Sequence, residues 1–389
     1  MSLPRQGDAA GPLAGLTVIE LASIGPGPFC GMMLSDMGAN VVRVERGGEL
    51  DAWSRSPVLD RGRRSVVVDL KTAAGVEATL GLVTHADVVL EGWRPGVAER
   101  LGVGPHECLA RNPHLVYGRI TGWGRSGPYA DTAGHDITYL ATTGALHAIG
   151  RSGERPVPPV NLVGDFGGGG MLLAFGVLCA VIHARETGRG QVVDAAIVDG
   201  VAALTGMLHG FMAHGLWEDT RGVNLLDGGA PFYDTYACAD GKHVAVGALE
   251  ARFFRALVER LGIADDPAFA GDHLDRACWP AIRARLTETF LQRTRDEWHA
   301  LLKNTDACVA PVLSFAEAIH DEHNLARELF CGVGGELQPA PTPRFSDTPC
   351  ATPRPAPTPG AHTERILGAT DEGPHPYDST GTHRPAPTS

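Results

Sequence analysis

The 389-residue chain contains few lysines, few aromatic residues and no cysteines at the CxxC spacing. Only three of its 33 basic residues are lysines, and 45 acidic residues bring the formal net charge to −12. An acidic chain is not expected to present an extended nucleic-acid-binding face. An anionic ligand would therefore need a local basic pocket, and the planar fork of donors on arginine suits a phosphate well.

The eight cysteines are dispersed along the chain, which argues against a disulfide framework or a zinc site and predicts reduced thiols in a cytoplasmic protein. Residues 1–10 lack the apolar core of a signal peptide. The longest apolar stretch, residues 171–184, is too short to cross a bilayer, so it predicts a buried helix and no membrane insertion.

Alternating strand and helix patterns fill the first half of the chain. Strands are predicted over 17–21, 41–44, 65–70, 87–91 and 115–120, with helices over 29–37 and 72–84 between them. This βαβ order predicts an α/β domain with a parallel sheet, extending to about residue 200.

The second half predicts a helix over 171–187, helical texture over 195–215, and then a smaller α+β domain. Its strands are expected over 232–237 and 243–246, and its helices over 251–262 and 280–303. Residues 339–389 hold 12 of the 28 prolines, which is typical of an extended arm. We therefore predict a large domain over 11–200, a small domain over 225–325, an arm over 326–370 and a flexible tail over 371–389.

The segment Gly25-Pro26-Gly27-Pro28 follows a predicted strand and opens a helix. Its position is similar to that of a dinucleotide fingerprint, but the third glycine is replaced by Cys30 and two prolines stiffen the turn. A loop that lines a ligand pocket is the preferred interpretation.

Basic residues are frequent near the predicted strand ends of the same half. In open α/β sheets ligands bind beyond the carboxyl ends of the strands, so these side chains could converge on a phosphate-bearing ligand. Each of them alone is more often a solvated surface residue. The set comprises Arg43, Arg46, Arg55, Arg61, Arg63, Arg64, Lys71, Arg94 and Arg100.

Asp165 stands before four successive glycines, 167–170, and the apolar helix. Aspartate is a preferred helix N-cap, which gives a purely structural interpretation. In the functional alternative, the glycines let a substrate approach the backbone, and the helix N-terminus stabilises a developing oxyanion. His135, near the start of another predicted helix, is open to structural and acid–base roles, and Glu250 by itself is typical of a surface residue.

Together these stretches resemble the class III CoA-transferase superfamily, and within it the racemase branch. The resemblance covers about residues 11–367 and rests on motifs that occur in the family's order. They include GPLAGLTVIELASIGPGPF, RGRRSVVVDLK, EGWRPGVAERLGVGP, YGRITGWGRSGPYADTAGHDITYLATTGAL, PVPPVNLVGDFGGGG, GRGQVVDAAIVDG and GGAPFYDTYACADGKHVAVGALE.

The resemblance implies a large Rossmann-like domain built from the N-terminal part and the returning arm, a smaller domain, and an interlocked homodimer. The active site would lie between the large domain of one subunit and the small domain of the other. An acyl-CoA would be the substrate, with no cofactor beyond its own CoA moiety. The family's CoA-binding positions fall on Arg46, Val68, Asp69, Leu70, Lys71, Gly92, Trp93, Arg94, Arg100, Gly134, Asp136, Ile137, Thr138 and Tyr139.

The resemblance also assigns the catalytic residues His135, Asp165 and Glu250. Racemases carry histidine before the aspartate at position 136, and Ala251 replaces the proline usual after the glutamate. The implied reaction inverts C2 of 2-methylacyl-CoA thioesters through an enolate, in lipid and fatty acid metabolism. The alternatives are CoA transfer between an acyl-CoA and a carboxylic acid with Asp165 as nucleophile, and CoA binding without catalysis.

Overall fold

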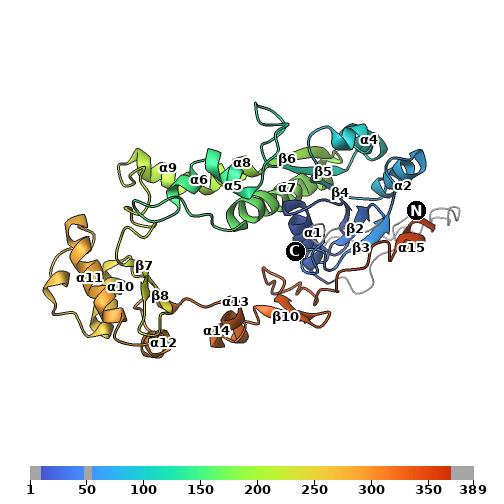
Figure 1. The fold of residues 1–389 in the computed structure, drawn as a ribbon. Helices are drawn as coiled ribbons and strands as arrows, with labels where there is room; N and C mark the ends of the chain where they lie inside the picture. Colours follow the sequence, from blue (N-terminus) through green and yellow to red (C-terminus); the bar gives the residue numbers. More distant parts are fainter. Residues whose placement is uncertain (1–9, 48–54, 369–389) are drawn as a thin grey trace, which may run out of the picture.

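The computed structural model describes residues 10–47 and 55–368, and its centre is a six-stranded parallel sheet of order β3-β2-β1-β4-β5-β6 (Figure 1). Every predicted strand of this half is present, with its ends shifted by a few residues, and the α/β class is confirmed. The strands are β1 (Thr17–Leu21), β2 (Asn40–Glu45), β3 (Arg64–Val67), β4 (Val88–Glu91), β5 (Val116–Thr121) and β6 (Gln191–Ala196).

Both faces of this sheet are buried, because successive side chains of each strand point to opposite sides. Val18 belongs to the core on one face, and its neighbour Ile19 belongs to the core on the other. Helices α1 (Pro26–Asp36) and α7 (Leu172–Thr187) cover the first face. The second is covered by α2 (Ala73–Val83), α3 (Val97–Arg100), α4 (Pro105–Arg111) and α15 (Thr363–Leu367).

A π-helix, η1 (Leu162–Met171), runs directly into α7, so the helical segment is longer than the sequence predicted. At 26 residues, Leu162–Thr187 has the length and apolar composition of a membrane span. Leu173, Ala174 and Val177 are nevertheless buried in the core beside the sheet, which is the packing of a core helix in a globular domain. The helix ends as predicted, with Gly188 in the left-handed conformation that terminates many helices.

Four further helices extend from the sheet toward a second body. They are α5 (Asp136–Thr142), α6 (Ala145–Ala148), α8 (Ile197–Leu204) and α9 (Gly206–Ala213). The second body has a three-stranded antiparallel sheet, β7 (Tyr233–Ala237), β8 (His243–Gly247) and β9 (Val309–Pro311). Around it lie α10 (Ala251–Leu261), η2 (Pro267–Phe269), η3 (Arg276–Cys278), α11 (Trp279–Phe290) and α12 (Arg295–Leu302). The predicted helix over 280–303 is thus two helices.

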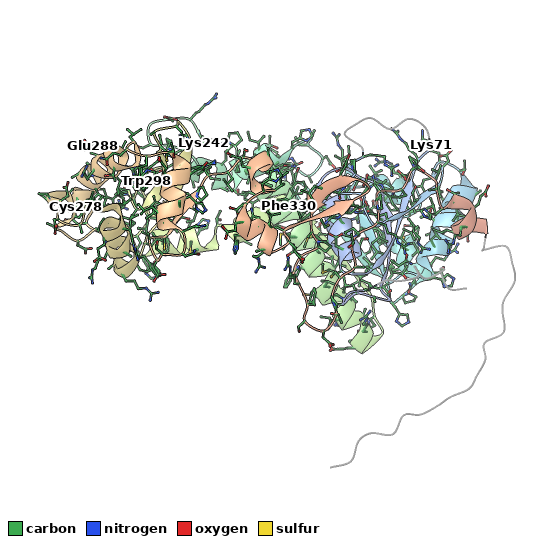
Figure 2. All side chains as sticks on the ribbon, turned by 90° about the horizontal axis from the view of Figure 1, so that it is seen from below. Lys71, Lys242, Cys278, Glu288, Trp298 and Phe330 are labelled. Carbon is green, nitrogen blue, oxygen red and sulfur yellow. The ribbon has the colours of Figure 1, made fainter. Side chains whose placement is uncertain are left out.

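The second body has its own core, in which aromatic rings pack among aliphatic side chains. Phe290 stacks on Tyr236 at 5.2 Å and meets Trp298 edge-on at 5.4 Å. Figure 2 shows this body, with Lys242, Glu288 and Trp298, at one end of the molecule and Lys71 at the other. The domain boundaries given above stay a prediction, and the predicted tail 371–389 lies outside the described residues.

The C-terminal arm returns from the second body to the large sheet (Figure 1). Along it lie α13 (Phe315–Ala318), α14 (Glu322–Ala326) and the hairpin β10 (Phe330–Val333) and β11 (Glu336–Pro339). The arm then follows the outer edge of β3. There the backbone N–H of Val67 donates to Thr363 Oγ1 at 3.0 Å, and that of His362 donates to the Ser65 carbonyl at 3.0 Å. The edge strand is therefore covered by the chain's own C-terminal part.

Four of the arginines considered for phosphate binding are instead buried in the large domain. Arg43 and Arg63 both donate to the Glu20 carboxylate, at 2.6 and 2.9 Å. Arg61 forms a two-point ion pair with Asp36 and also donates to the Pro339 carbonyl of the arm at 2.7 Å. The fourth, Arg64, is likewise buried and donates to Asn40. These residues are not solvated, because their side chains hold helix, sheet and arm together.

We predict that Arg61→Ala destabilises the fold strongly, because it leaves the buried carboxylate of Asp36 without its partner. Breaking a buried pair in this way costs about 3–5 kcal/mol. Urea unfolding measures the change in the free energy of unfolding. The control is Arg111→Ala, which removes a comparable two-point pair with Glu77 on the surface and should have far less effect. Equal effects of the two substitutions would contradict this account of Arg61.

Candidate active site

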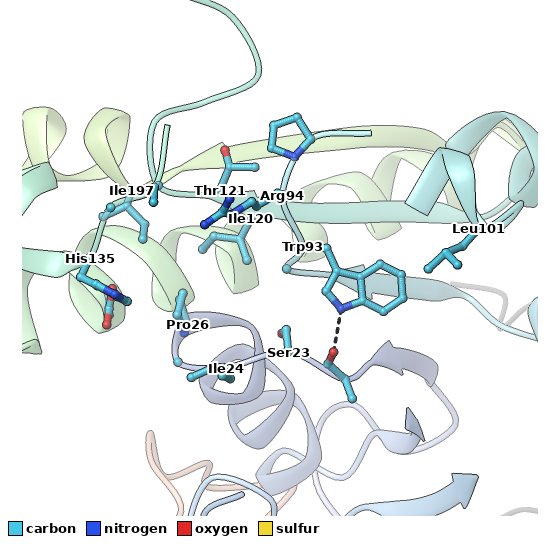
Figure 3. Close-up of a pocket in the computed structure, with 18 of the residues that line it drawn as sticks. Ser23, Ile24, Pro26, Trp93, Arg94, Leu101, Ile120, Thr121, His135 and Ile197 are labelled. Carbon is cyan, nitrogen blue, oxygen red and sulfur yellow. Dashed lines mark hydrogen bonds between the residues drawn. The ribbon is translucent and has the colours of Figure 1, made fainter. Parts of the chain in front are cut away.

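A cavity of about 720 Å³ opens beyond the carboxyl ends of the parallel strands. It lies where the strand order reverses, since β1 pairs with β2 on one side and β4 on the other. Open α/β sheets bind ligands at such a switch point. Figure 3 shows how the loops after β1 and β4 and the carboxyl end of β5 contribute Ser23, Trp93 and Thr121 to its walls.

Gly25, in the turn after β1, and Pro26, the first residue of α1, line the cavity; the predicted segment thus lies at the pocket, although helix α1 already begins at Pro26 rather than at residue 29. Most of the residues predicted to bind CoA line the same cavity. They are Arg46, Val68, Asp69, Leu70, Lys71, Gly92, Trp93, Arg94, Gly134 and Tyr139, and the predicted catalytic residues His135 and Asp165 join them.

Five of the predicted site residues do not line this cavity. Arg100 is exposed at the end of α3, and Ile137 and Thr138 are exposed on α5. Thr138 bonds instead with the backbone of His135, from whose N–H it accepts at 3.0 Å. Asp136 is buried behind the cavity wall, and Glu250 belongs to the second body.

The cavity has three exposed cations that a phosphate-bearing ligand could reach. Arg46 follows β2, Lys71 lies in the loop after β3, and Arg94 lies in the loop after β4. Unlike the buried arginines, their side chains are accessible to a ligand. The prediction of a local basic pocket in an acidic chain therefore holds with a smaller set of residues.

Asp165 lies within η1 and lines the cavity, so of the two alternatives left open for it, the purely structural role as a helix N-cap is wrong. The N-cap position of η1 is held by Asn161, whose side chain is near enough to the Asp165 carboxyl group to oppose the rise in its pKa. Burial, followed by the negative charge of Asp136, raises the pKa of Asp165 to about 6. A carboxyl group with this pKa can both accept and donate a proton near neutral pH.

Asp136 connects α5 with η1. Its Oδ2 accepts a hydrogen bond from the backbone N–H of Asp165 at 2.7 Å, and the residue is buried, with only 6% of its surface exposed. The contact requires glycine at position 164, since a Cβ there would overlap the Asp136 carboxylate. Because this N–H donates to Asp136, it is not available to an enolate oxygen.

The glycine run after Asp165 serves packing rather than substrate approach. A Cβ on Gly168 would lie 2.8 Å from the backbone nitrogen of Val201, and one on Gly170 would lie 2.7 Å from the Phe29 ring. Both distances are shorter than real Cβ contacts allow. The run therefore lets η1 lie directly against α1 and α8, which fixes the position of Asp165 at the cavity.

His135 occupies the N-cap position of α5, and its side chain is exposed at the cavity. Figure 3 shows it on the side of the cavity opposite Trp93 and Leu101. Glu250 begins α10 and is exposed, and it does not meet His135 within one chain. The predicted trio is thus brought together only in part.

Sequence reasoning missed two residues of the site. Asn161 stands four positions before Asp165, a spacing that places side chains together on a helix. Trp123 follows β5 between two glycines, and that position after a buried strand was the available signal. Among residues 10–47 and 55–368, no group of three or more His, Cys, Asp and Glu side chains could hold a metal ion.

Comparison with known proteins shows the family to which this chain belongs. The sequence profile described as CoA-transferase family III matches residues 13–363. The chain belongs to this family. Two relatives of family III, the alpha-methylacyl-CoA racemases of Mus musculus and Homo sapiens, are each 44% identical to it over 357 residues, covering 91% of this chain and 92% of theirs.

More distant relatives match nearly the whole length as well. A succinyl-CoA–D-citramalate CoA-transferase of Chloroflexus aurantiacus is 32% identical and covers 93% of this chain and 95% of its own. The crystal structure of a CaiB/BaiF family protein from Brucella suis matches with a TM-score of 0.80 at 28% identity, covering 93% of this chain and all of that one.

We predict that Asp136→Asn lowers the pKa of Asp165, because the substitution removes a neighbouring negative charge while keeping an acceptor for the Asp165 N–H. Titration of the labelled carboxyl carbon by NMR, assigned with Asp165→Asn, measures this pKa. Asp131→Asn, at an exposed position of the preceding loop, is the control and should change it less. An unchanged pKa in Asp136→Asn would refute the electrostatic role of Asp136.

Proposed function

We propose that this family III chain is an α-methylacyl-CoA racemase, which inverts C2 of 2-methylacyl-CoA thioesters by 1,1-proton transfer. The observation that carries the proposal is the presence of His135 and Asp165 on the walls of one cavity that also holds Arg46, Lys71 and Arg94. The 44% identity to two alpha-methylacyl-CoA racemases supports it.

Inversion at C2 requires a base on one face of the carbon and an acid on the other. We assign these positions to His135 and Asp165, which exchange roles with the handedness of the substrate. The C2–H bond breaks, its proton passes to the base, and its electron pair moves toward the thioester oxygen. A proton from the second group then reaches the opposite face. Each positioned acid or base contributes roughly 10²–10⁴ in rate.

The pKa of Asp165, about 6, supports this double role. Above that pH the carboxylate is available as a base, and below it the carboxylic acid can return a proton. Arg46, Lys71 and Arg94 would hold the CoA phosphates, so that remote contacts orient the reacting carbon. The CoA belongs to the substrate, and we propose no further cofactor.

We further propose that Glu250 of the partner subunit orients His135 in a homodimer. Glu250 lies in the second body and does not line the cavity of its own chain. A carboxylate beside the imidazole would fix its tautomer and stabilise its protonated form. We also propose that the enzyme is cytoplasmic and acts in lipid and fatty acid metabolism.

The second candidate function is CoA transfer, with Asp165 as the nucleophile that forms an acyl anhydride. It is favoured by the 32% identity to a succinyl-CoA–D-citramalate CoA-transferase over nearly the whole chain. Mass spectrometry of the protein after incubation with an acyl-CoA distinguishes the two. An acyl group on Asp165, with acceptor-dependent CoA exchange, would support transfer.

If the enzyme is a racemase, incubation of a (2R)-2-methylacyl-CoA in D₂O should yield both the (2R) and the (2S) thioester with deuterium at C2. Chiral chromatography and mass spectrometry of the recovered thioester measure the two changes. Boiled enzyme serves as the control for spontaneous exchange. Recovery of the pure (2R) form without deuterium, across several 2-methylacyl-CoAs, would contradict the proposal. If the chain then bound CoA but converted none of these thioesters, the third alternative, CoA binding without catalysis, would be supported.

The homodimer predicts complementation between two inactive variants, His135→Gln and Glu250→Gln. When the two chains are co-expressed, each mixed dimer has one site with both native side chains, so activity should return. The racemisation rate of the purified mixed dimer measures this. Activity no higher than that of the separate variants would contradict a site shared between subunits.

A further inference from the structure

The turn between β8 and α10, residues 248–250, carries Glu250. The backbone carbonyl of Glu250 is fixed by the first turn of α10, since it accepts hydrogen bonds from the N–H groups of Phe253 and Phe254 at 2.9 Å each. The peptide that precedes Glu250 lies outside the helix, so its carbonyl, on Leu249, needs a partner from elsewhere in the fold. That partner helps to set the direction in which the turn presents the Glu250 side chain.

The partner of the Leu249 carbonyl is His273, which lies 24 residues further along the chain, between η2 and η3. The Nε2 atom of His273 is 2.9 Å from the carbonyl oxygen. Because a carbonyl oxygen can only accept, Nε2 carries the proton and donates it to this bond. His273 is only 6% exposed, so its loss would leave the carbonyl without a donor of the same strength and direction.

The imidazole of His273 is held in one orientation by the aromatic core of the second body. It stacks on the Phe254 ring of α10, with centroids 4.6 Å apart and planes at 12°. The Phe232 ring meets it edge-on at 4.8 Å. The backbone of His273 is fixed as well, since its carbonyl accepts from Trp279 Nε1 at 2.9 Å. The direction of the Nε2–H group is therefore set by packing before it meets the turn.

We infer that His273 is a positioning residue, which acts through the Leu249 carbonyl to direct Glu250 toward His135 of the partner subunit. The inference rests on the proposed racemase function and on the proposed role of Glu250 in the dimer. His273 touches no substrate and exchanges no proton with it. Its effect should therefore reach the proton transfers that use His135 and spare those that use Asp165.

The test is His273→Phe, which keeps a ring against Phe254 and Phe232 and removes the N–H donor. Deuterium exchange in D₂O is measured for each C2 configuration of a 2-methylacyl-CoA, and the configuration that Asp165→Asn still exchanges is the one that His135 serves. An error of about 1 Å in position can cost roughly 10² in rate. We expect kcat to fall by up to this factor for that configuration, with KM and exchange of the other configuration little changed.

Two further variants separate the direction of Glu250 from the stability of the core. His273→Gln keeps an amide N–H within reach of the Leu249 carbonyl, and should retain exchange at both configurations. Trp298→Phe removes another buried ring N–H of the same core, which donates to the Phe290 carbonyl at 2.8 Å. It should lower the melting temperature and change exchange at neither configuration.

Thermal melting shows whether each variant folds. If His273→Phe does not fold, His273→Met takes its place, because a flexible apolar side chain adapts to the same space and also lacks the donor. Native exchange in a folded variant, or an equal loss at both configurations, would overturn the inference. Absence of exchange in the native protein would instead refute the racemase function, and native exchange in Glu250→Gln would refute the role of Glu250.

Discussion

The hydrogen bond from the Asp165 backbone N–H to the Asp136 carboxylate joins the two segments that form the site. It ties η1 to α5, so that Asp165, His135 and Tyr139 share one cavity. The same carboxylate places a negative charge beside Asp165 and contributes to raising its pKa to about 6. A single buried side chain thus holds the proposed acid–base group in position and, after burial, is the second cause of its raised pKa.

Close backbone packing makes this bond possible. Gly164 leaves space for the Asp136 carboxylate, and Gly168 and Gly170 let η1 approach α8 and α1. Glycine is unfavourable inside a helix because of its conformational freedom, so a run of four must be offset by what it permits. Here it permits a helix to lie against two others and to hold Asp165 at the edge of the sheet.

The strands, the class of the fold and the position of the cavity could be predicted from the sequence, because hydrophobic patterning and strand order follow local chemistry. The roles of the arginines could not. Arg46 and Arg61 look alike in the sequence, yet within the described residues only Arg61 meets an acidic partner across the fold, at Asp36. The engagement of the Asp165 N–H depends on a contact 29 residues away in sequence, which no local pattern reveals.

The central claim is that two groups work on opposite faces of C2, and variants that keep one of them test it most directly. Asp165→Asn keeps His135, and should still exchange deuterium at C2 without inversion for one of the two C2 configurations of a 2-methylacyl-CoA. His135→Gln keeps Asp165, and should do the same for the other configuration. NMR of each pure hand in D₂O measures this. If both variants keep exchange at the same C2 configuration, both groups reach the same face of C2 and the account is contradicted.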